Sequence, residues 1–523
     1  MDNKNNKKDN KQRQAGINTK SFTKVHRKVG VFFMPLLLVI VITGAWSLFR
    51  AELLQWQFPH FELGQTSFEA SSAESGVDNG LESKSSQRKS SQRKSLQELV
   101  DIARNENGFV YSDFSIHDKE RYGDFVLFFN KTDGVENMLF MDPVSGEALD
   151  ASQASFSETV YDLHLKLLLP SFIGKYLVGL MGLLLMYLVF TGFLAHKNIG
   201  KNFYQLRLHK GRQIFATDLH KLLGNWSLVF SGLMSITGAL LGLFSIVLLV
   251  LALAAYGGDV KALFADFLGT QPKPVGGVAD FISLDSLYQL AQQQWEGYKI
   301  STIEIHNYAD PAMRVTFEGE LMNGFLTQQH VTYDAINGGI TFVTDFTDKG
   351  AGGYMYSALP SLHFASFGGT WLKLIYWFLT LALLLVMVTG ITIKSLRLRE
   401  KGFSTSDLIV TQLSQAVILA ASIAVVFGVI FTGLMNPGDY TTLGIITLAA
   451  VIYTVASNRF QWLSSVSLAG WVLVIAGVVV VFKGEVLLMV LCLTLGLVWL
   501  FSQKVGSMVN KAKPSSNQKG STQ

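Results

Sequence analysis

Long apolar runs separated by two long polar segments make up this chain of 523 residues. The first run, Val29–Phe49, is long enough to cross a hydrocarbon layer of roughly 30 Å as a helix. In chain order the runs are Val29–Phe49, Tyr176–Ala195, Trp226–Ala255, Trp371–Ile393, Leu408–Leu434, Thr441–Ala456, Trp462–Phe482 and Val486–Phe501. The pattern predicts a multi-pass α-helical membrane protein with about eight spans. No small-residue cleavage site follows the first run, so we expect a retained helix and not a removed signal peptide.

Both polar segments share one order of elements. Each starts with an amphipathic helical pattern, at Leu96–Asn107 and at Leu284–Trp295. Runs with strand character follow, at Phe109–His117, Asp124–Lys131 and Met138–Leu149 in the first segment and at Lys299–His306, Met313–Glu318 and Gln328–Tyr333 in the second. The turns Asp142–Gly146 and Asp334–Gly338 have the same Asp-to-Gly spacing. We therefore predict two small α+β modules.

The membrane helices repeat as well. His26 is followed by Gly30 and then by Thr43-Gly44, and His220 is followed at identical spacing by Gly224 and Thr237-Gly238. The returning helices carry Leu163-His164 before Thr191-Gly192, and Leu362-His363 before Thr389-Gly390, with a difference of one residue in spacing. The sequence thus predicts an internal duplication of a helix–module–helix unit.

The distribution of charged residues along the chain predicts how the chain is oriented in the membrane. The net charge of +4 is small, whereas Lys and Arg gather at the tail, in Lys197–Lys221, in Lys394–Lys401 and at the C-terminus. This bias predicts that both termini are cytoplasmic and that both modules lie on the outer side of the membrane. The basic SSQRK repeat within Ser83–Ser95 lies in a long loop, where charge weighs less. The expected segments are 1–25 (tail), 26–49 (first span), 50–160 (first module), 161–196 (interfacial helix and second span), 197–219 (basic loop), 220–255 (third span), 256–360 (second module), 361–394 (fourth span), 395–407 (loop), 408–503 (four further spans) and 504–523 (tail).

Four histidines fall into two layers of this topology. His26 and His220 lie at cytoplasmic helix ends, and His164 and His363 lie at outer helix ends. A single interfacial histidine is usually an anchor among lipid headgroups, but four at matching repeat positions favour metal ligands. Two opposed imidazoles suit a six-coordinate haem iron. With one cysteine, Cys492, the chain has no C-x-x-C-H attachment site, so we expect two non-covalent b haems, one in each layer.

Other features leave alternatives open. His196 has Lys394 at its repeat position, and it is either an alternative inner ligand or a basic anchor. The Thr-Gly pairs serve either close helix packing or close approach of a macrocycle. His60, His117, His209, His306 and His330 lie in soluble segments and are expected to be ordinary. No Asp or Glu lies in mid-span, which disfavours a proton-coupled transporter. No phosphate-binding loop, dinucleotide fingerprint or H-E-x-x-H is present, so electrons must come from another molecule.

Residues 20–400 resemble the PepSY-associated transmembrane-helix family. The resemblance lies in a duplicated unit that has an H-x-x-x-G helix start, a small module and a returning helix preceded by Leu-His. The resemblance implies a location in the bacterial inner membrane, PepSY-like periplasmic modules, di-haem b binding and periplasmic reduction of ferric siderophores. Carried over residue by residue, it makes His26, His164, His220 and His363 the ligand candidates. The expected partners are a ferric siderophore or similar chelate, membrane lipid and an electron donor (a quinol or a cytoplasmic reductase), with no nucleic acid. It gives no role to the last four apolar runs.

The resulting hypothesis is a ferric-chelate reductase that carries electrons from an inner to an outer haem. A second hypothesis is a binding or regulatory protein whose modules engage an envelope protease or another partner. A third is a siderophore permease.

Overall fold

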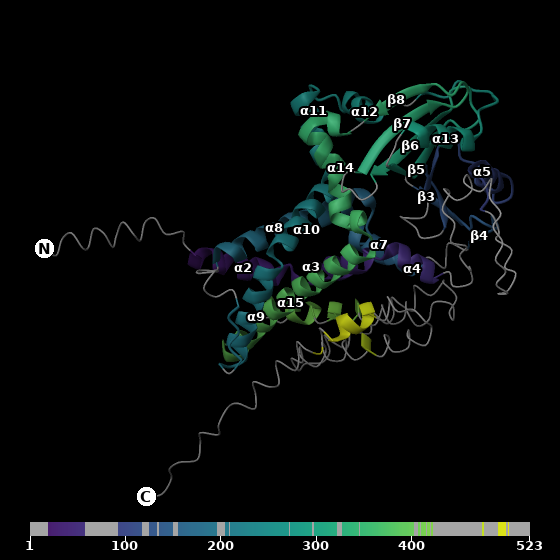
Figure 1. Ribbon diagram of the computed structural model, residues 1–523. Coiled ribbons are helices and arrows are strands. Elements are labelled where there is room, and N and C mark those ends of the chain that lie inside the picture. Colours follow the sequence, from purple (N-terminus) through teal and green to yellow (C-terminus); the bar gives the residue numbers. More distant parts are fainter. Residues whose placement is uncertain are drawn as a thin grey trace, which may run out of the picture. The chain divides into compact units, whose positions relative to one another are not determined.

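The structure is a computed structural model that describes residues 19–57, 93–117, 125–132, 135–149, 155–195, 204–208, 210–270, 272–294, 298–321, 327–344, 346–401 and short parts of 406–421, 473–474 and 490–500 (Figure 1). It divides into two compact units. The helical unit comprises Met1–Ser47, Val160–Leu243 and Leu374–Gln523, and the sheet unit comprises Leu48–Thr159 and Phe244–Lys373.

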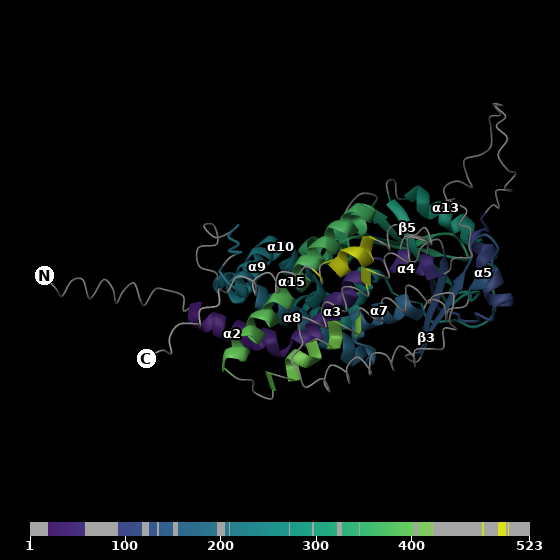
Figure 2. The same ribbon diagram turned by 90° about the horizontal axis from the view of Figure 1, so that it is seen from below.

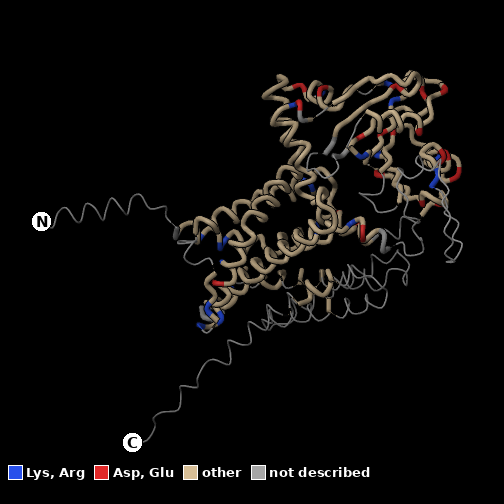
Figure 3. The backbone as a smooth tube through the Cα atoms, in the orientation of Figure 1, with Lys and Arg blue, Asp and Glu red and all other residues tan. Residues whose placement is uncertain are grey.

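Helices make up the helical unit. They are α2 (Thr19–Phe32), α3 (Met34–Ser47), α8 (Ser171–Ala195), α9 (Arg212–Trp226), α10 (Leu228–Gly242) and most of α15 (Gly369–Lys401). The most apolar of them are α3, α8 and α10. The tubes of α3, α8 and α10 carry almost no charged residues (Figure 3). Glycine lets α8 and α10 run in contact (Figure 2), since a Cβ at Gly182 would lie 2.7 Å from the Ala239 nitrogen.

Two described helical segments, Ser171–Ala195 and Ser366–Leu398, are long and apolar enough to cross a membrane as single helices. The number rises to five if each of three bent helix pairs forms one span. The predicted runs beyond residue 408 lie mostly outside the described residues, so the expectation of eight spans stays a prediction.

Two of the bent pairs show the same design. α2 and α3 meet at Phe33 with a bend of 70°, and α9 and α10 meet at Ser227 with a bend of 66°. Each bend follows its histidine, His26 or His220, by the same number of positions. Pro35 explains the first bend because it lacks an N–H for the helix ladder. At the second, the Ser227 hydroxyl donates to the Leu223 carbonyl at 2.8 Å, a back-bond that bends helices.

Several helix bounds differ from the expected ones. The predicted third span, Trp226–Ala255, is split into α10 and α11 (Phe244–Ala255), and α12 (Val260–Leu268) follows. The helix that carries His220 begins at Arg212, inside the segment expected to be a basic loop. Apolar periodicity predicted the helical segments but not where the helices break.

The sheet unit contains one continuous antiparallel sheet, to which the segments of the two predicted modules contribute four strands each. Its strand order is β4-β3-β2-β1-β5-β6-β7-β8. The bounds are β1 Phe114–His117, β2 Val126–Thr132, β3 Val135–Met141, β4 Ala148–Leu149, β5 Tyr298–His306, β6 Arg314–Leu321, β7 Thr327–Asp334 and β8 Ile340–Thr344. β1 and β5 join the two halves, with Ile116 opposite Ile303. Each half would otherwise expose an edge strand, and pairing the two edges satisfies their backbone groups.

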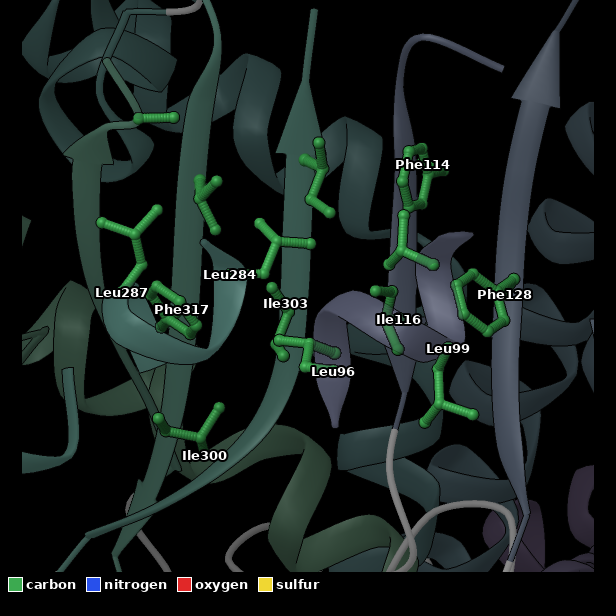
Figure 4. Close-up of a cluster of buried hydrophobic side chains, with 14 of the residues drawn as sticks. Leu96, Leu99, Phe114, Ile116, Phe128, Leu284, Leu287, Ile300, Ile303 and Phe317 are labelled. Atoms are coloured by element: carbon green, nitrogen blue, oxygen red, sulfur yellow. The ribbon is translucent and has the colours of Figure 1, made fainter. Parts of the chain in front are cut away.

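A shared core fixes this junction. Helices α5 (Leu96–Asn105) and α13 (Leu284–Gln294) contribute buried side chains to one cluster with alternate residues of the central strands. Leu99 and Leu287 are fully buried, and they lie in the same cluster as Ile116, Ile303 and Phe317 (Figure 4). Strand alternation sends the apolar residues of both halves to this face.

The two helices also cap one another. The Asp285 carboxylate of α13 accepts hydrogen bonds from the Leu96 and Gln97 amides of α5, at 2.7 and 3.2 Å. The Gln97 side chain accepts one from the Leu284 amide of α13 at 3.2 Å. Each helix thus satisfies N–H groups that the other leaves without an intrahelical partner.

The reciprocal cap predicts that Asp285→Ala destabilises the junction by about 1 kcal/mol, as the loss of a helix cap usually does. Hydrogen exchange should speed up at the Leu96 and Gln97 amides. Asp280→Ala is the control because Asp280 is exposed. Equal exchange in both variants would show that the carboxylate does not cap α5.

Candidate functional site

The His26 ring of α2 lies against α8. Its Nδ1 atom is 3.0 Å from the Leu188 carbonyl oxygen and 3.2 Å from the Thr191 hydroxyl. The next residue is Gly192, where an added Cβ would lie 3.2 Å from Cε1 of the ring. A helix that carried any other side chain at this position would push the imidazole away.

The same arrangement recurs at His220 of α9, which lies against α15. Nδ1 is 2.8 Å from the Val386 carbonyl oxygen and 3.2 Å from the Thr389 hydroxyl. An added Cβ at Gly390 would lie 3.4 Å from Cε1. The carbonyl is again the one three positions before the threonine.

His164, on α7 (Ser155–Lys166), has a third version of this contact with α3. Nδ1 is 2.9 Å from the Ile40 carbonyl oxygen, three positions before Thr43. A Cβ at Gly44 would lie 2.6 Å from Cε1, closer than real Cβ atoms approach. We call each set of carbonyl, threonine and glycine an imidazole cradle.

The cradles assign the protons of the imidazoles. A carbonyl oxygen only accepts hydrogen bonds, so the nitrogen that faces it, Nδ1, donates. The neutral ring then has its lone pair on Nε2, which is the form that binds a metal. Among the described residues no hydrogen bond reaches Nε2 of His26 or His220. The cradles thus present two metal-competent imidazoles.

The structure brings His26 and His220 together, as their layer predicts. Their ring centres are 6.3 Å apart and their planes are inclined by 78°. A metal–imidazole bond is about 2.0–2.1 Å and the ring centre lies about 1.1 Å behind the nitrogen, so imidazoles on opposite sides of one metal have centres roughly 6.3 Å apart. The distance between the ring centres therefore equals the distance expected for two imidazoles on one metal.

The other candidates lie elsewhere or outside the described residues. His363 is buried on α14 (Gly350–Phe364), in the sheet unit, whereas His164 belongs to the helical unit. Their pairing as an outer site therefore stays a prediction. His196 lies outside the described residues. No cluster of three or more histidine, cysteine or acidic side chains that could hold a metal occurs in the described ranges.

Three histidines that the sequence left without a role lie on the face of the sheet opposite the core. His117, His306 and His330 share this face with Glu304 and Glu318. The nearest approaches are 3.7 Å between His306 Nε2 and a Glu304 oxygen and 3.6 Å between His330 Nε2 and a Glu318 oxygen. The neighbouring imidazoles, His306 first, hold the pKa of Glu304 below its usual value.

Sequence reasoning found the histidines but missed what the Thr-Gly pairs do. It treated helix packing and approach of a macrocycle as the alternatives, whereas three of the pairs receive an imidazole. The sequence contained a signal for this contact. Each of the three Thr-Gly pairs lies on one helix of a repeat, and its histidine lies on the other helix at the same predicted level. Spacing alone does not show which face of a helix meets its neighbour.

Apolar helices of spanning length place the chain among membrane proteins. It belongs to the family of the PepSY-associated TM region, whose profile matches residues 23–396. An uncharacterized protein of Pseudomonas aeruginosa is 30% identical over 164 residues, which are 31% of this chain and 41% of that relative. The match therefore spans less than half of the relative.

The third cradle predicts the effect of a single methyl group. Gly44→Ala places a Cβ against the His164 ring and should lower the thermal unfolding temperature in detergent, despite the roughly 1 kcal/mol that alanine adds to helix propensity. Gly232→Ala is the matched control, because nothing lies within 4 Å of its Cβ position. If both variants were stabilised equally, the ring would not be in contact with Gly44.

Proposed function

We propose that this protein is a haem b membrane oxidoreductase that carries electrons across the bacterial inner membrane to a ferric chelate in the periplasm. The observation that carries the proposal is the pair of cradled imidazoles, His26 and His220, at 6.3 Å between ring centres. These two residues would hold the inner haem through its iron.

The residues around this pair have definite roles in the proposal. The Leu188 and Val386 carbonyls hold the Nδ1 protons and so keep both Nε2 atoms available. A haem held by these two imidazoles would supply one-electron transfer. The apolar helices exclude water, which tunes the potential of a bound metal.

The proposed outer site rests on one observed contact, that of His164, and on the repeat position of His363. His164 has the same Nδ1–carbonyl contact as the inner pair. His363 is its repeat counterpart, and we propose these two as ligands of a second haem. The proposed topology has the helix–module–helix unit duplicated, eight spans, cytoplasmic termini and a periplasmic sheet unit. His196 stays an alternative inner ligand.

The substrate class follows from the proposed electron path. Reduction of iron(III) to iron(II) weakens its bonds to hard oxygen ligands, so one electron suffices to loosen a siderophore-type chelate. The donor would be a quinol or a cytoplasmic reductase, because no nicotinamide or flavin motif is present in the sequence.

Absorption of the purified protein tests the proposal. We expect a b-type spectrum that changes on reduction, with a stoichiometry of two haems. His26→Ala and His220→Ala should each remove the inner haem, while His164→Ala and His363→Ala should each remove the outer one. His306→Ala is the control, because His306 lies on the sheet and outside the cradles. A folded, colourless protein would contradict the proposal.

A second candidate function rests on the sheet unit. One eight-stranded sheet with edges at β4 and β8 is suited to bind an extended partner segment, as expected of a regulatory protein. The absorption experiment separates the two functions, since the regulatory one needs no haem. Solute uptake into vesicles without an electron donor would instead favour a permease.

A further inference from the structure

The cradles of His26 and His220, here called the inner cradles, each contain a second acceptor besides the carbonyl. It is the hydroxyl of Thr191 for His26 and the hydroxyl of Thr389 for His220. Each hydroxyl donates its own proton to a carbonyl of its own helix. Thr191 Oγ1 lies 2.7 Å from the Tyr187 oxygen and 3.2 Å from the Leu188 oxygen. Thr389 Oγ1 lies 2.7 Å from the Leu385 oxygen and 2.9 Å from the Val386 oxygen. A threonine hydroxyl has one proton and two lone pairs. The lone pairs therefore face the imidazole Nδ1 atoms, each at 3.2 Å.

Each inner Nδ1–H thus lies between two oxygen acceptors, a carbonyl and a hydroxyl. Both threonines are buried, with exposed fractions of 0% and 5%, so water does not compete for these contacts. In such surroundings a hydrogen bond is electrostatically stronger than in water. The arrangement occurs independently on α8 and on α15, which makes a packing accident a poor explanation.

We propose that Thr191 and Thr389 are positioning residues that set the redox potential of the inner site. This inference rests on the proposed haem function. An acceptor on Nδ1–H raises the electron density and basicity of the ring, and a more basic ligand favours iron(III) over iron(II). Two acceptors on each ring therefore lower the midpoint potential. An inner site of low potential passes electrons readily to an acceptor of higher potential on the outer side.

Paired substitutions separate the hydroxyl from the shape of the side chain. Thr191→Val and Thr389→Val keep the volume and remove the oxygen, whereas Thr191→Ser and Thr389→Ser keep the oxygen. Thr380→Val is the matched control, since Thr380 is buried on α15 and its recorded hydrogen bond goes to the Tyr376 carbonyl of its own helix at 2.8 Å.

The measurement is a spectroelectrochemical titration of the purified holoprotein, with haem content determined on the same samples. We expect each valine variant to shift the ferric-to-ferrous preference about tenfold toward ferrous iron, which is an increase of about 59 mV for one electron. The serine variants and Thr380→Val should match the wild type. Loss of inner haem in the valine variants alone, with the serine variants intact, would also support a role for the hydroxyl.

Two results would overturn the inference. One is a valine variant with unchanged potential and full haem content. The other is an equal change in the valine and serine variants, or in Thr380→Val, which would indicate a general packing effect. Failure of the haem proposal itself looks different, because the wild type would then contain no haem to titrate.

Discussion

A polar ring in an apolar bundle must find a hydrogen-bond partner inside the protein, and this constraint shapes the whole helical unit. Backbone groups within a membrane cannot bond to water, so they bond within their own helix. A carbonyl oxygen nevertheless has a second lone pair, and a neighbouring imidazole can reach it where no side chain intervenes. Gly192, Gly390 and Gly44 provide these openings, and an imidazole Nδ1 occupies each one.

The rest of the helical unit brings two such rings together. Helices α2 and α9 each bend sharply after the histidine, at Phe33 and Ser227. Helices α8 and α15 supply the cradles to which His26 and His220 bind. Each imidazole is thus fixed through a helix of its own repeat. The fixed orientation of the rings is what suits them to hold a metal, because a ligand that is already oriented loses little freedom on binding.

Some of this was predictable from the residues. Hydrophobic run length predicted α8 and α15 as long apolar helices, and repeated spacing indicated that His26 and His220, whose ring centres are 6.3 Å apart, belong together. The bends were not predictable in the same way, since Pro35 has no counterpart at the second bend, where Ser227 acts instead. Alternation predicted the strands, but it did not show that β1 pairs with β5, because a contact between distant segments leaves no local pattern. The cradles were missed for the same reason.

Electron paramagnetic resonance of the oxidised, purified protein tests the central claim most directly, because it reports the axial ligands of a bound iron. The account predicts a low-spin ferric signal with two imidazole ligands, which disappears from the inner site when either His26 or His220 is replaced. A folded protein with no low-spin haem signal would contradict the account. So would an inner-site signal that persists in the His26 variant and in the His220 variant.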